Sequence, residues 1–365
     1  MSTLRVVFAG GGTGGHLYPA IAIAEEFQRR VQNFQCVFVG TARGIEARVI
    51  PKLSYRLELV AVRGLLRQVT WRNLLVPFYL IKSIRQCLRL FRQIKPDLII
   101  GTGGYVSGPA LLAAWLSRRK FVVQEQNSFP GLVNRWWGER ANLVFLSFAE
   151  SRKFFSRQEH LRIVGNPVRL NFNQENRDRA AKKWELQANR ATLLVFGGSQ
   201  GARKINELIL TLLPQLQTLE KVQVLWATGA QNFDDVVRRA GEARGIKIIP
   251  YIDDMASAFS LADFVLCRAG ASTIFELAHY GLPSLLVPFP FATADHQTFN
   301  ARVLEQAGAA RLLVEKELTA EKLFSHIQEL AAHAELRQRM SAAAKKMARP
   351  QAASEIVENC LALLK

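Results

Sequence analysis

Two glycine-rich segments of this sequence share one pattern and one setting. FAGGGTGGH at residues 8–16 and VFGGSQGA at residues 195–202 each follow a short apolar run, precede an amphipathic stretch and contain G-G-[TS]-x-G. A strand that turns through glycines into a helix presents backbone N–H groups at the helix start, and many α/β proteins bind phosphate in this way. The repetition predicts two α/β domains of similar plan.

Apolar runs and amphipathic stretches alternate along the rest of the chain. The runs are rich in Val, Ile, Leu and Phe and occupy residues 5–9, 36–39, 98–100, 121–123, 143–146, 193–196, 222–226, 264–267 and 284–287. Continuous runs of this kind are typical of parallel strands that are buried on both faces. We therefore expect two Rossmann-like parallel-sheet domains that face a cleft. The expected bounds are 1–165 for the first domain, 166–350 for the second, and 351–365 for a C-terminal helix that packs back on the first domain.

Positive charge is concentrated in the first half of the chain. The 48 Lys and Arg against 30 Asp and Glu give a net charge of +18. Residues 1–165 contain 24 basic and 9 acidic residues, a net of +15, whereas residues 166–365 contain 24 and 21, a net of +3. Residues 59–96 alone contain eight basic residues and no acidic one. Such a field indicates nucleic acid, an anionic membrane or a phosphate-bearing ligand as partner.

Cysteine usage and hydropathy favour a reduced, cytosolic protein. The four cysteines lie far apart and no apolar signal segment opens the sequence. Residues 98–117 contain no charge, but four glycines and Pro109 interrupt them, which argues against a membrane-spanning helix. The spacing of His, Cys and carboxylate residues matches no metal site. We therefore expect neither a metal nor another cofactor.

The first glycine loop leaves more than one ligand chemistry open. Gly10, Gly12 and Gly15 satisfy the GxGxxG dinucleotide pattern, yet no acidic residue directly follows the second apolar run to bind a ribose. Arg43 lies near that position, so NADP is one alternative, and glycines that only form tight turns are another. The paired loops, with a third glycine-rich segment at 101–109, favour phosphate-bearing ligands in both domains.

Several polar residues follow the apolar runs. His16 would lie in the first turn of a helix, where it could act as a general base or only hydrogen-bond a phosphate or the loop. Glu125 and Asn127 could contact a ligand or hold their own loop. Thr273 and Glu276 match a capping box, and the alternative role of Glu276 is to accept hydrogen bonds from two ribose hydroxyls. A further polar cluster suited to sugar hydroxyls comprises Asp295, His296, Gln297 and Asn300.

Eight motifs occur in order over nearly the whole chain. They are GGTGGH, GTGGYVSGP, EQNSFPG, VGNPVR, FGGSQGA, YIDDM, CRAGASTIFE and HQTFNA. On these motifs the sequence resembles the MurG family of bacterial N-acetylglucosaminyltransferases. The resemblance implies a glycosyltransferase-B fold and an inverting, metal-independent transfer of GlcNAc from UDP-GlcNAc to the C4 hydroxyl of MurNAc in undecaprenyl-pyrophosphoryl-MurNAc-pentapeptide (lipid I). The product would be lipid II for peptidoglycan synthesis, and cell-wall synthesis and division proteins would be partners.

The resemblance also implies roles for the residues that match its motifs. The UDP-GlcNAc site would comprise Thr13, Gly14, Gly15, Asn127, Arg169, Ser199, Ile252, Ala271, Ser272, Thr273, Ile274, Phe275, Glu276 and Gln297. Within it, Ser199 would meet the diphosphate, Ile252 the uracil and Glu276 the ribose. We assign the acceptor pyrophosphate to the glycine loops, namely Gly11, Gly12, Gly103, Gly104 and Tyr105. Gln124 departs from the family, which has His before EQN, and this favours His16 as the base.

The basic stretch suits an enzyme whose acceptor is a membrane lipid. Apolar and basic residues recur there at helical spacing, and Pro77 suggests a break in the helix. Part of the helix would face the core. We expect the rest to contact anionic lipid headgroups at the cytoplasmic face of the membrane, through Trp71, Leu75, Phe78, Arg85, Arg89 and Arg92.

Other interpretations remain open. A UDP-GlcNAc 2-epimerase or another glycolipid glycosyltransferase of the same fold would share the nucleotide motifs, although an epimerase would not need the basic apolar surface. A nucleic-acid-binding protein would explain the charge. It would not explain the paired glycine loops, so we expect no nucleic acid partner.

Overall fold

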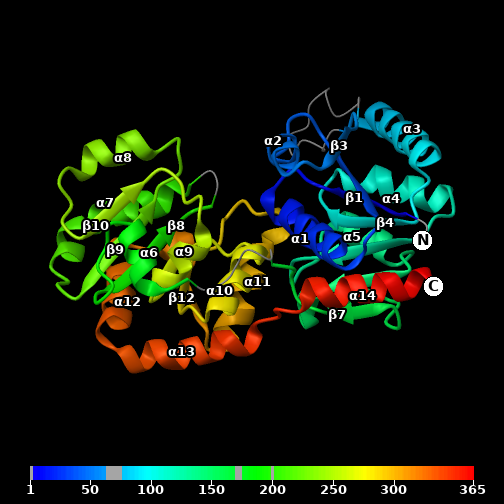
Figure 1. Ribbon diagram of the computed structural model, residues 1–365. Helices are drawn as coiled ribbons and strands as arrows, with labels where there is room; N and C mark the ends of the chain where they lie inside the picture. Colours follow the sequence, from blue (N-terminus) through cyan, green and yellow to red (C-terminus); the bar gives the residue numbers. More distant parts are fainter. Residues whose placement is uncertain (1–2, 63–75, 169–174, 199–200) are drawn as a thin grey trace. The chain divides into compact units, whose positions relative to one another are not determined.

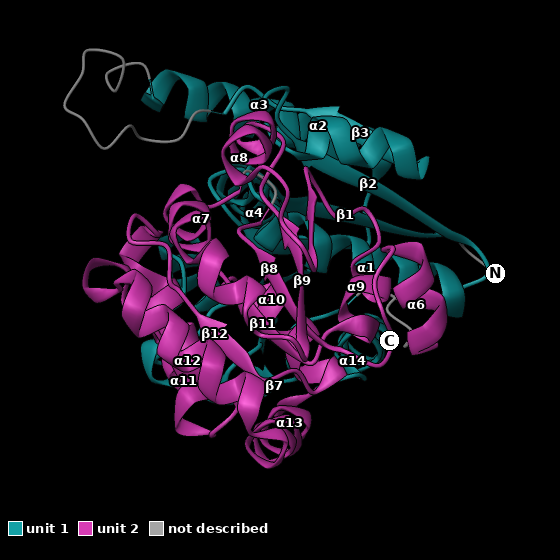
Figure 2. Ribbon diagram, turned by 90° about the vertical axis from the view of Figure 1, so that its left-hand side faces the viewer, with its two compact units in different colours: residues 1–170, 349–365 teal, residues 171–348 magenta. Residues whose placement is uncertain are grey.

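The computed structural model describes residues 3–62, 76–168, 175–198 and 201–365, and the chain divides into two compact units (Figure 1). Unit 1 comprises residues 1–170 and 349–365, and unit 2 comprises residues 171–348; Figure 2 colours them separately. The last segment of the chain thus belongs to the same unit as the first.

Unit 1 is built on a parallel sheet. Within the described residues the sheet has seven strands in the order β3-β2-β1-β4-β5-β6-β7. The strands are β1 (Leu4–Gly10), β2 (Phe34–Gly40), β3 (Arg56–Leu59), β4 (Leu98–Gly103), β5 (Phe121–Glu125), β6 (Leu143–Leu146) and β7 (Leu161–Ile163). The helices are α1 (Gly14–Arg30), α2 (Glu46–Val49), α3 (Val76–Ile94), α4 (Ser107–Leu116), α5 (Leu132–Gly138) and α14 (Ala352–Leu364).

Both faces of this sheet are buried. Successive side chains of a strand point to opposite faces, so β1 contributes to two separate cores. Val7 and Ala9 of β1 pack in the core that includes residues of α3 and α4. Val6 and Phe8 pack in the core that includes residues of α1 and α14. In Figure 1, α14 in red lies beside α1 in blue. The C-terminal helix therefore completes one face of the first sheet.

Unit 2 repeats the plan. Its parallel sheet has six strands among the described residues, in the order β10-β9-β8-β11-β12-β13. The strands are β8 (Ala191–Phe196), β9 (Val222–Ala227), β10 (Ile246–Ile249), β11 (Phe264–Cys267), β12 (Ser284–Leu286) and β13 (Ala310–Leu312). The helices are α6 (Arg177–Lys183), α7 (Arg203–Gln217), α8 (Phe233–Ala240), α9 (Met255–Leu261), α10 (Ala271–Tyr280), α11 (His296–Gln306), α12 (Ala320–Ala332) and α13 (Ala334–Met347). The two parallel sheets confirm the predicted fold class.

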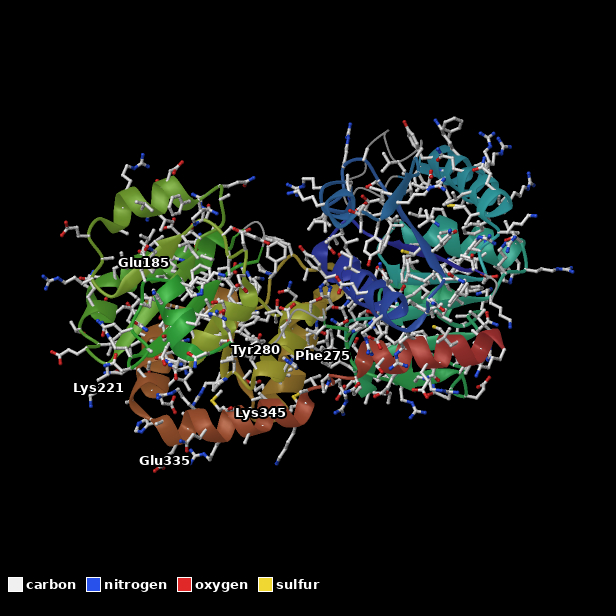
Figure 3. All side chains as sticks on the ribbon, in the orientation of Figure 1. Glu185, Lys221, Phe275, Tyr280, Glu335 and Lys345 are labelled. Carbon is white, nitrogen blue, oxygen red and sulfur yellow. The ribbon has the colours of Figure 1, made fainter. Side chains whose placement is uncertain are left out.

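The end of α10 is packed against α13. Gly281 caps α10 in the left-handed conformation (φ 67°), and a Cβ atom there would lie 2.5 Å from Cε of Lys345 on α13. Figure 3 shows Phe275 and Tyr280 on α10 and Lys345 on α13. This packing supports α10, whose first residues are candidates for ligand binding.

The helix α3 presents two different faces. Cys87, Leu90 and Phe91 are buried in the core of unit 1. Phe78 and Ile81 are 64% and 52% exposed. Pro77 is the second described residue of α3, and the expected break there concerns the chain before Val76, which lies outside the described residues. None of the described helices is both long and apolar enough to cross a membrane.

Candidate functional site

The loop between β1 and α1 is held by hydrogen bonds to a buried acid, Glu46. Glu46 accepts hydrogen bonds from the backbone N–H of Gly12 (2.8 Å) and from the N–H and hydroxyl of Thr41 (2.8 and 2.9 Å). A Cβ atom on Gly11 would lie 2.6 Å from this carboxylate, so a side chain at that position would displace Glu46 from its hydrogen bonds. Glu46 thereby fixes the loop and occupies the N–H of Gly12. Because its carboxylate is used by these protein groups, Glu46 is not a ribose-binding acid.

The next residues begin α1 and leave its start open. Thr13 is the N-cap and its side chain makes no capping hydrogen bond, and the first turn contains no acidic residue. The N–H groups of Gly14 and Gly15 lie where a helix has no internal acceptors for them. The positive end of the helix dipole adds to this preference for an anion.

The glycine turn after β4 meets the first loop around His16. A Cβ atom on Gly104 would lie 2.6 Å from the carbonyl oxygen of Gly11, and one on Gly103 would lie 2.9 Å from Nδ1 of His16. Both glycines have positive φ values, 99° for Gly103 and 76° for Gly104. Tyr105, 40% exposed, stands over Gly12. The structure thus brings the five glycine-loop residues and His16 together in unit 1.

The ring of His16 is oriented by hydrogen bonds on one side. Its Nδ1 lies 3.1 Å from the carbonyl oxygen of Thr102 and 2.9 Å from Oε1 of Gln126. Within unit 1 as described, no protein group hydrogen-bonds to Nε2. The Thr102 hydroxyl also donates to the backbone carbonyl of His16 (2.8 Å), which ties α1 to β4.

Glu125 has a structural task. Its carboxylate is 1% exposed and accepts from the N–H of Asn127 (2.8 Å) and of Gly131 (3.0 Å), and from Nδ2 of Asn134 (2.8 Å). Of the two roles left open by the sequence, the structure selects the one that holds the loop. Asn127 is placed by the same carboxylate, which accepts from its Nδ2 (3.1 Å).

Gln124 is wholly buried, so it offers no group to a ligand. Its Nε2 donates to Oγ of Ser147 (3.2 Å) and to Oδ1 of Asn166 (3.3 Å), and its Oε1 accepts from Nε2 of Gln126. Gln126 was not among the predicted site residues. Gln126 carries no charge, and nothing in the sequence distinguishes it from the other residues of its motif. Only its contact with His16 in the structure indicates a role for it.

The second glycine loop leads into α7 in unit 2. A Cβ atom on Gly197 would lie 2.2 Å from the N atom of Ala202, and one on Gly201 would lie 2.3 Å from the carbonyl oxygen of Thr228. The first turn of α7 contains no acidic residue and begins with Arg203 and Lys204. This helix start is also suited to a phosphate.

The start of α10 differs from the expected capping box. Gly270 is the N-cap, so Thr273 is the third residue of the helix and cannot cap it. The capping-box interpretation is therefore wrong, and Glu276 lies one turn further along, half-buried. Cys267 before this segment is wholly buried, and burial raises the pKa of its thiol, so the thiol stays neutral.

Two other predicted residues of unit 2 lie in the segments that follow its strands, one in a loop and one in the first turn of a helix. Ile252, after β10, is buried. Gln297, at the start of α11, accepts a hydrogen bond from the N–H of Phe289 (2.9 Å) through Oε1. Asp254 caps α9, and although burial opposes it, the ion pair with Lys183 lowers the pKa of Asp254.

Some predictions fall outside the described residues: Trp71, Leu75, Arg169 and Ser199.

The exposed side of α3 contains the other residues predicted to meet the membrane, which are Phe78, Arg85, Arg89 and Arg92. Their spacings of three, four or seven residues keep them on one face of the helix. In the described part of the chain, no group of three or more His, Cys, Asp or Glu side chains could hold a metal ion.

Comparisons with known proteins cover nearly the whole chain. Residues 6–146 match the glycosyltransferase family 28 N-terminal domain and residues 192–356 match the family 28 C-terminal domain. A relative from Chlorobaculum tepidum, named UDP-N-acetylglucosamine--N-acetylmuramyl-(pentapeptide) pyrophosphoryl-undecaprenol N-acetylglucosamine transferase, is 44% identical over 99% of this chain and 100% of its own. A relative of the same name from Syntrophus aciditrophicus is 42% identical over 100% and 99%.

A solved structure extends the likeness to three dimensions. The crystal structure of Acinetobacter baumannii MurG superposes with a TM-score of 0.77 and is 30% identical, covering 97% of this chain and 98% of its own. The similarity therefore includes both units and is not confined to the glycine loops.

Proposed function

This chain belongs to the MurG family of glycosyltransferases, and from that membership we propose that it transfers GlcNAc from UDP-GlcNAc to lipid I, which gives lipid II. The observation that carries the proposal within the molecule is the meeting of two glycine loops around His16. Anion-binding glycine loops and a histidine with one ring nitrogen open to a ligand suit an acceptor that has both a pyrophosphate and a hydroxyl to be deprotonated.

We assign the acceptor to unit 1. Gly11 in the loop before α1, with Gly103, Gly104 and Tyr105 in the turn that meets it, would hold the pyrophosphate of lipid I. The N–H of Gly12 already binds Glu46, so the part of Gly12 is to shape the loop. By their place in the family motifs, Thr13, Gly14 and Gly15, at the open start of α1, are assigned to the sugar diphosphate of the donor, and Asn127 is assigned to its sugar.

The nucleotide of the donor is assigned to unit 2. Glu276 would accept hydrogen bonds from the ribose hydroxyls, the backbone at Ile252 would meet the uracil, and Gln297 would bind the GlcNAc hydroxyls. The N–H groups at the start of α7 would meet the diphosphate, and Ser199 is assigned to the diphosphate by its motif. The run Ala271 to Phe275 in the first turns of α10 would flank the nucleotide. Arg169 completes the nucleotide side.

The proposed reaction is a single displacement. Nε2 of His16 takes the proton of the C4 hydroxyl of MurNAc while that oxygen forms a bond to the anomeric carbon of GlcNAc. The bond from this carbon to the UDP oxygen breaks on the opposite face, and its electron pair leaves with UDP. One base is enough for inversion, and N–H groups at helix starts can stabilise the charge that develops on UDP. We infer that the transfer needs no metal.

The exposed face of α3 is assigned to the membrane. Phe78 and Ile81 can enter the headgroup region, and Arg85, Arg89 and Arg92 can pair with anionic lipids, each contributing about 1 kcal/mol near the surface. Such binding would hold the enzyme at the cytoplasmic face of the cell membrane, where it would meet lipid I. Partners among the cell-wall synthesis and division proteins would meet it there.

An assay of UDP release separates the proposal from the alternative of an epimerase. We expect UDP to appear from UDP-GlcNAc only when a lipid I analogue is added, since a transferase needs its acceptor. Conversion of UDP-GlcNAc to its 2-epimer, or UDP release that does not depend on the acceptor, would overturn the proposal.

A further inference from the structure

A chain of buried amide side chains leads from the interior of unit 1 to the ring of His16. Gln126 is 1% exposed, and the two hydrogens of its Nε2 are shared among three acceptors, which are the carbonyl oxygens of Thr102 (2.6 Å) and Gln124 (3.1 Å) and Oε1 of Gln124. The two backbone oxygens can only accept, so they fix which end of the amide is nitrogen. Oε1 of Gln126 must then face Nδ1 of His16, at 2.9 Å.

This arrangement determines where the proton of a neutral His16 ring lies. Nδ1 faces two acceptors, the Thr102 carbonyl oxygen at 3.1 Å and Oε1 of Gln126. A ring nitrogen between two acceptors must carry hydrogen, and in a neutral imidazole the other nitrogen then has the free electron pair. Nε2 is therefore the basic atom.

We propose that Gln126, held in turn by Gln124, is a positioning residue that keeps His16 in the Nδ1–H tautomer with Nε2 ready to accept the proton of the attacking hydroxyl. The inference rests on the proposed function, in which His16 is the base. When Nε2 takes the proton, Nδ1–H keeps both of its acceptors, so the imidazolium is stabilised by the same contacts. The aspartate of a Ser-His-Asp triad orients and stabilises its histidine in this way.

Gln124 belongs to the same device. It is wholly buried and is anchored at its other end by Ser147 and Asn166. Its Oε1 gives the Gln126 amide nitrogen an acceptor, so replacement of Gln124 should act on His16 through Gln126. A substrate has no access to either glutamine, which distinguishes both of them from binding residues.

The first test is kinetic. Gln126→Leu removes one of the two acceptors of Nδ1, and we expect kcat to fall about tenfold, as for one lost hydrogen bond, with the KM for UDP-GlcNAc unchanged. Gln223→Leu is the matched control. Gln223 is a buried glutamine of unit 2 with similar hydrogen bonds to Gln187 and Thr192, and its loss should cost stability without changing kcat.

A double mutant shows whether Gln126 acts through His16. If it does, Gln126→Leu costs about tenfold in the wild-type background and nothing further in His16→Ala, since residues that act as a unit are not additive. An equal loss of kcat in both backgrounds would mean a general structural role and would overturn the inference. A folded Gln126→Leu variant with wild-type kcat would overturn it too.

The second test observes the tautomer directly and needs no activity. The chain has six histidines, so ¹⁵N-histidine labelling of the full protein gives a simple spectrum, and His16→Ala identifies the His16 signals. His160 is an internal reference of the opposite form, because its Nε2 faces the Gly138 carbonyl oxygen at 2.8 Å. We expect Nδ1–H for His16 and Nε2–H for His160 in the wild-type protein, and a mixture of tautomers at His16 in Gln126→Leu.

The two tests separate the inference from the function on which it rests. An active wild-type enzyme whose His16 is in the Nε2–H form would overturn the inference and leave the transferase in place. Nδ1–H at His16 in a protein that transfers no GlcNAc would overturn the proposed function and leave the amide arrangement intact.

Discussion

Two buried carboxylates hold the ligand-side loops of unit 1. Glu46 and Glu125 are each about 1% exposed, and each accepts hydrogen bonds from loop backbone N–H groups. Glu125 follows a strand and could be singled out from the sequence, although its role could not. Glu46 belongs to none of the motifs, and one partner, Gly12, is 34 residues away. A contact of this range leaves no local pattern from which to predict it.

Loss of the Glu46 carboxylate should destabilise unit 1. Glu46→Ala leaves buried donors of Gly12 and Thr41 without acceptors, and we expect the free energy of unfolding to fall by about 3 kcal/mol, as measured by urea denaturation. Glu58→Ala, in the neighbouring strand β3, removes a more exposed acid and should change stability by less than about 0.5 kcal/mol. Equal stability of both variants would contradict the role of Glu46.

Two replacements should separate catalysis from donor binding. His16→Ala is expected to lower kcat by about 10²- to 10⁴-fold, the usual contribution of a general base, with little change in the KM for UDP-GlcNAc.

Glu276→Ala is expected to raise the KM for UDP-GlcNAc by roughly 10- to 100-fold, since the ribose hydroxyls lose the carboxylate that accepts their hydrogen bonds. Steady-state kinetics with varied donor measure both, and wild-type values in either variant would remove the role given to that residue.

Among the elements, the central strands were predictable and the edge strands were not. Every apolar run named from the sequence overlaps a strand, because strands buried on both faces need continuous apolar residues. The structure adds β3, β7, β10 and β13, which lie at or near the sheet edges. In β3 (Arg56–Leu59) charged residues alternate with leucines, and β7 (Leu161–Ile163) is only three residues long. Neither strand therefore forms an apolar run.

The helix α14 should contribute to the stability of unit 1. Ile356 and Val357 are wholly buried in the core that contains β1 and α1. Ile356→Ala should lower the free energy of unfolding by about 3 kcal/mol, as for other truncations of large core side chains. Glu358→Ala, on the exposed side of the same helix, is the control and should have little effect. Denaturant unfolding in which the two variants behave alike would mean that α14 adds nothing to this core.

At the scale of the whole molecule, the net charge of +18 is unevenly distributed along the chain. Most of the excess lies in residues 1–165, and α3 presents part of it beside exposed Phe78 and Ile81. The sequence predicted this surface from helical spacing, but it could not separate the core-facing side of α3 from the exposed side. That distinction depends on packing against α4, which is a tertiary contact.

The charge on α3 can be tested with vesicles that contain anionic lipid. Replacement of Arg85, Arg89 and Arg92 by Gln should weaken binding roughly 100-fold, at about 1 kcal/mol for each charge. Replacement of Arg179, Lys182 and Lys221, exposed bases of unit 2, changes the net charge equally and should leave binding nearly unchanged. Equal losses in both triple variants would mean that net charge, and not the α3 face, determines binding.

One transfer reaction tests the proposed function most directly. Labelled UDP-GlcNAc is incubated with the full chain, a lipid I analogue and EDTA, and the label and its linkage are followed in the lipid product. We predict transfer of the label to the C4 hydroxyl of MurNAc through a β-linkage, at a rate that EDTA does not change. Label that stays in the nucleotide fraction although the protein is folded, or transfer that stops when EDTA is added, would contradict the proposed function.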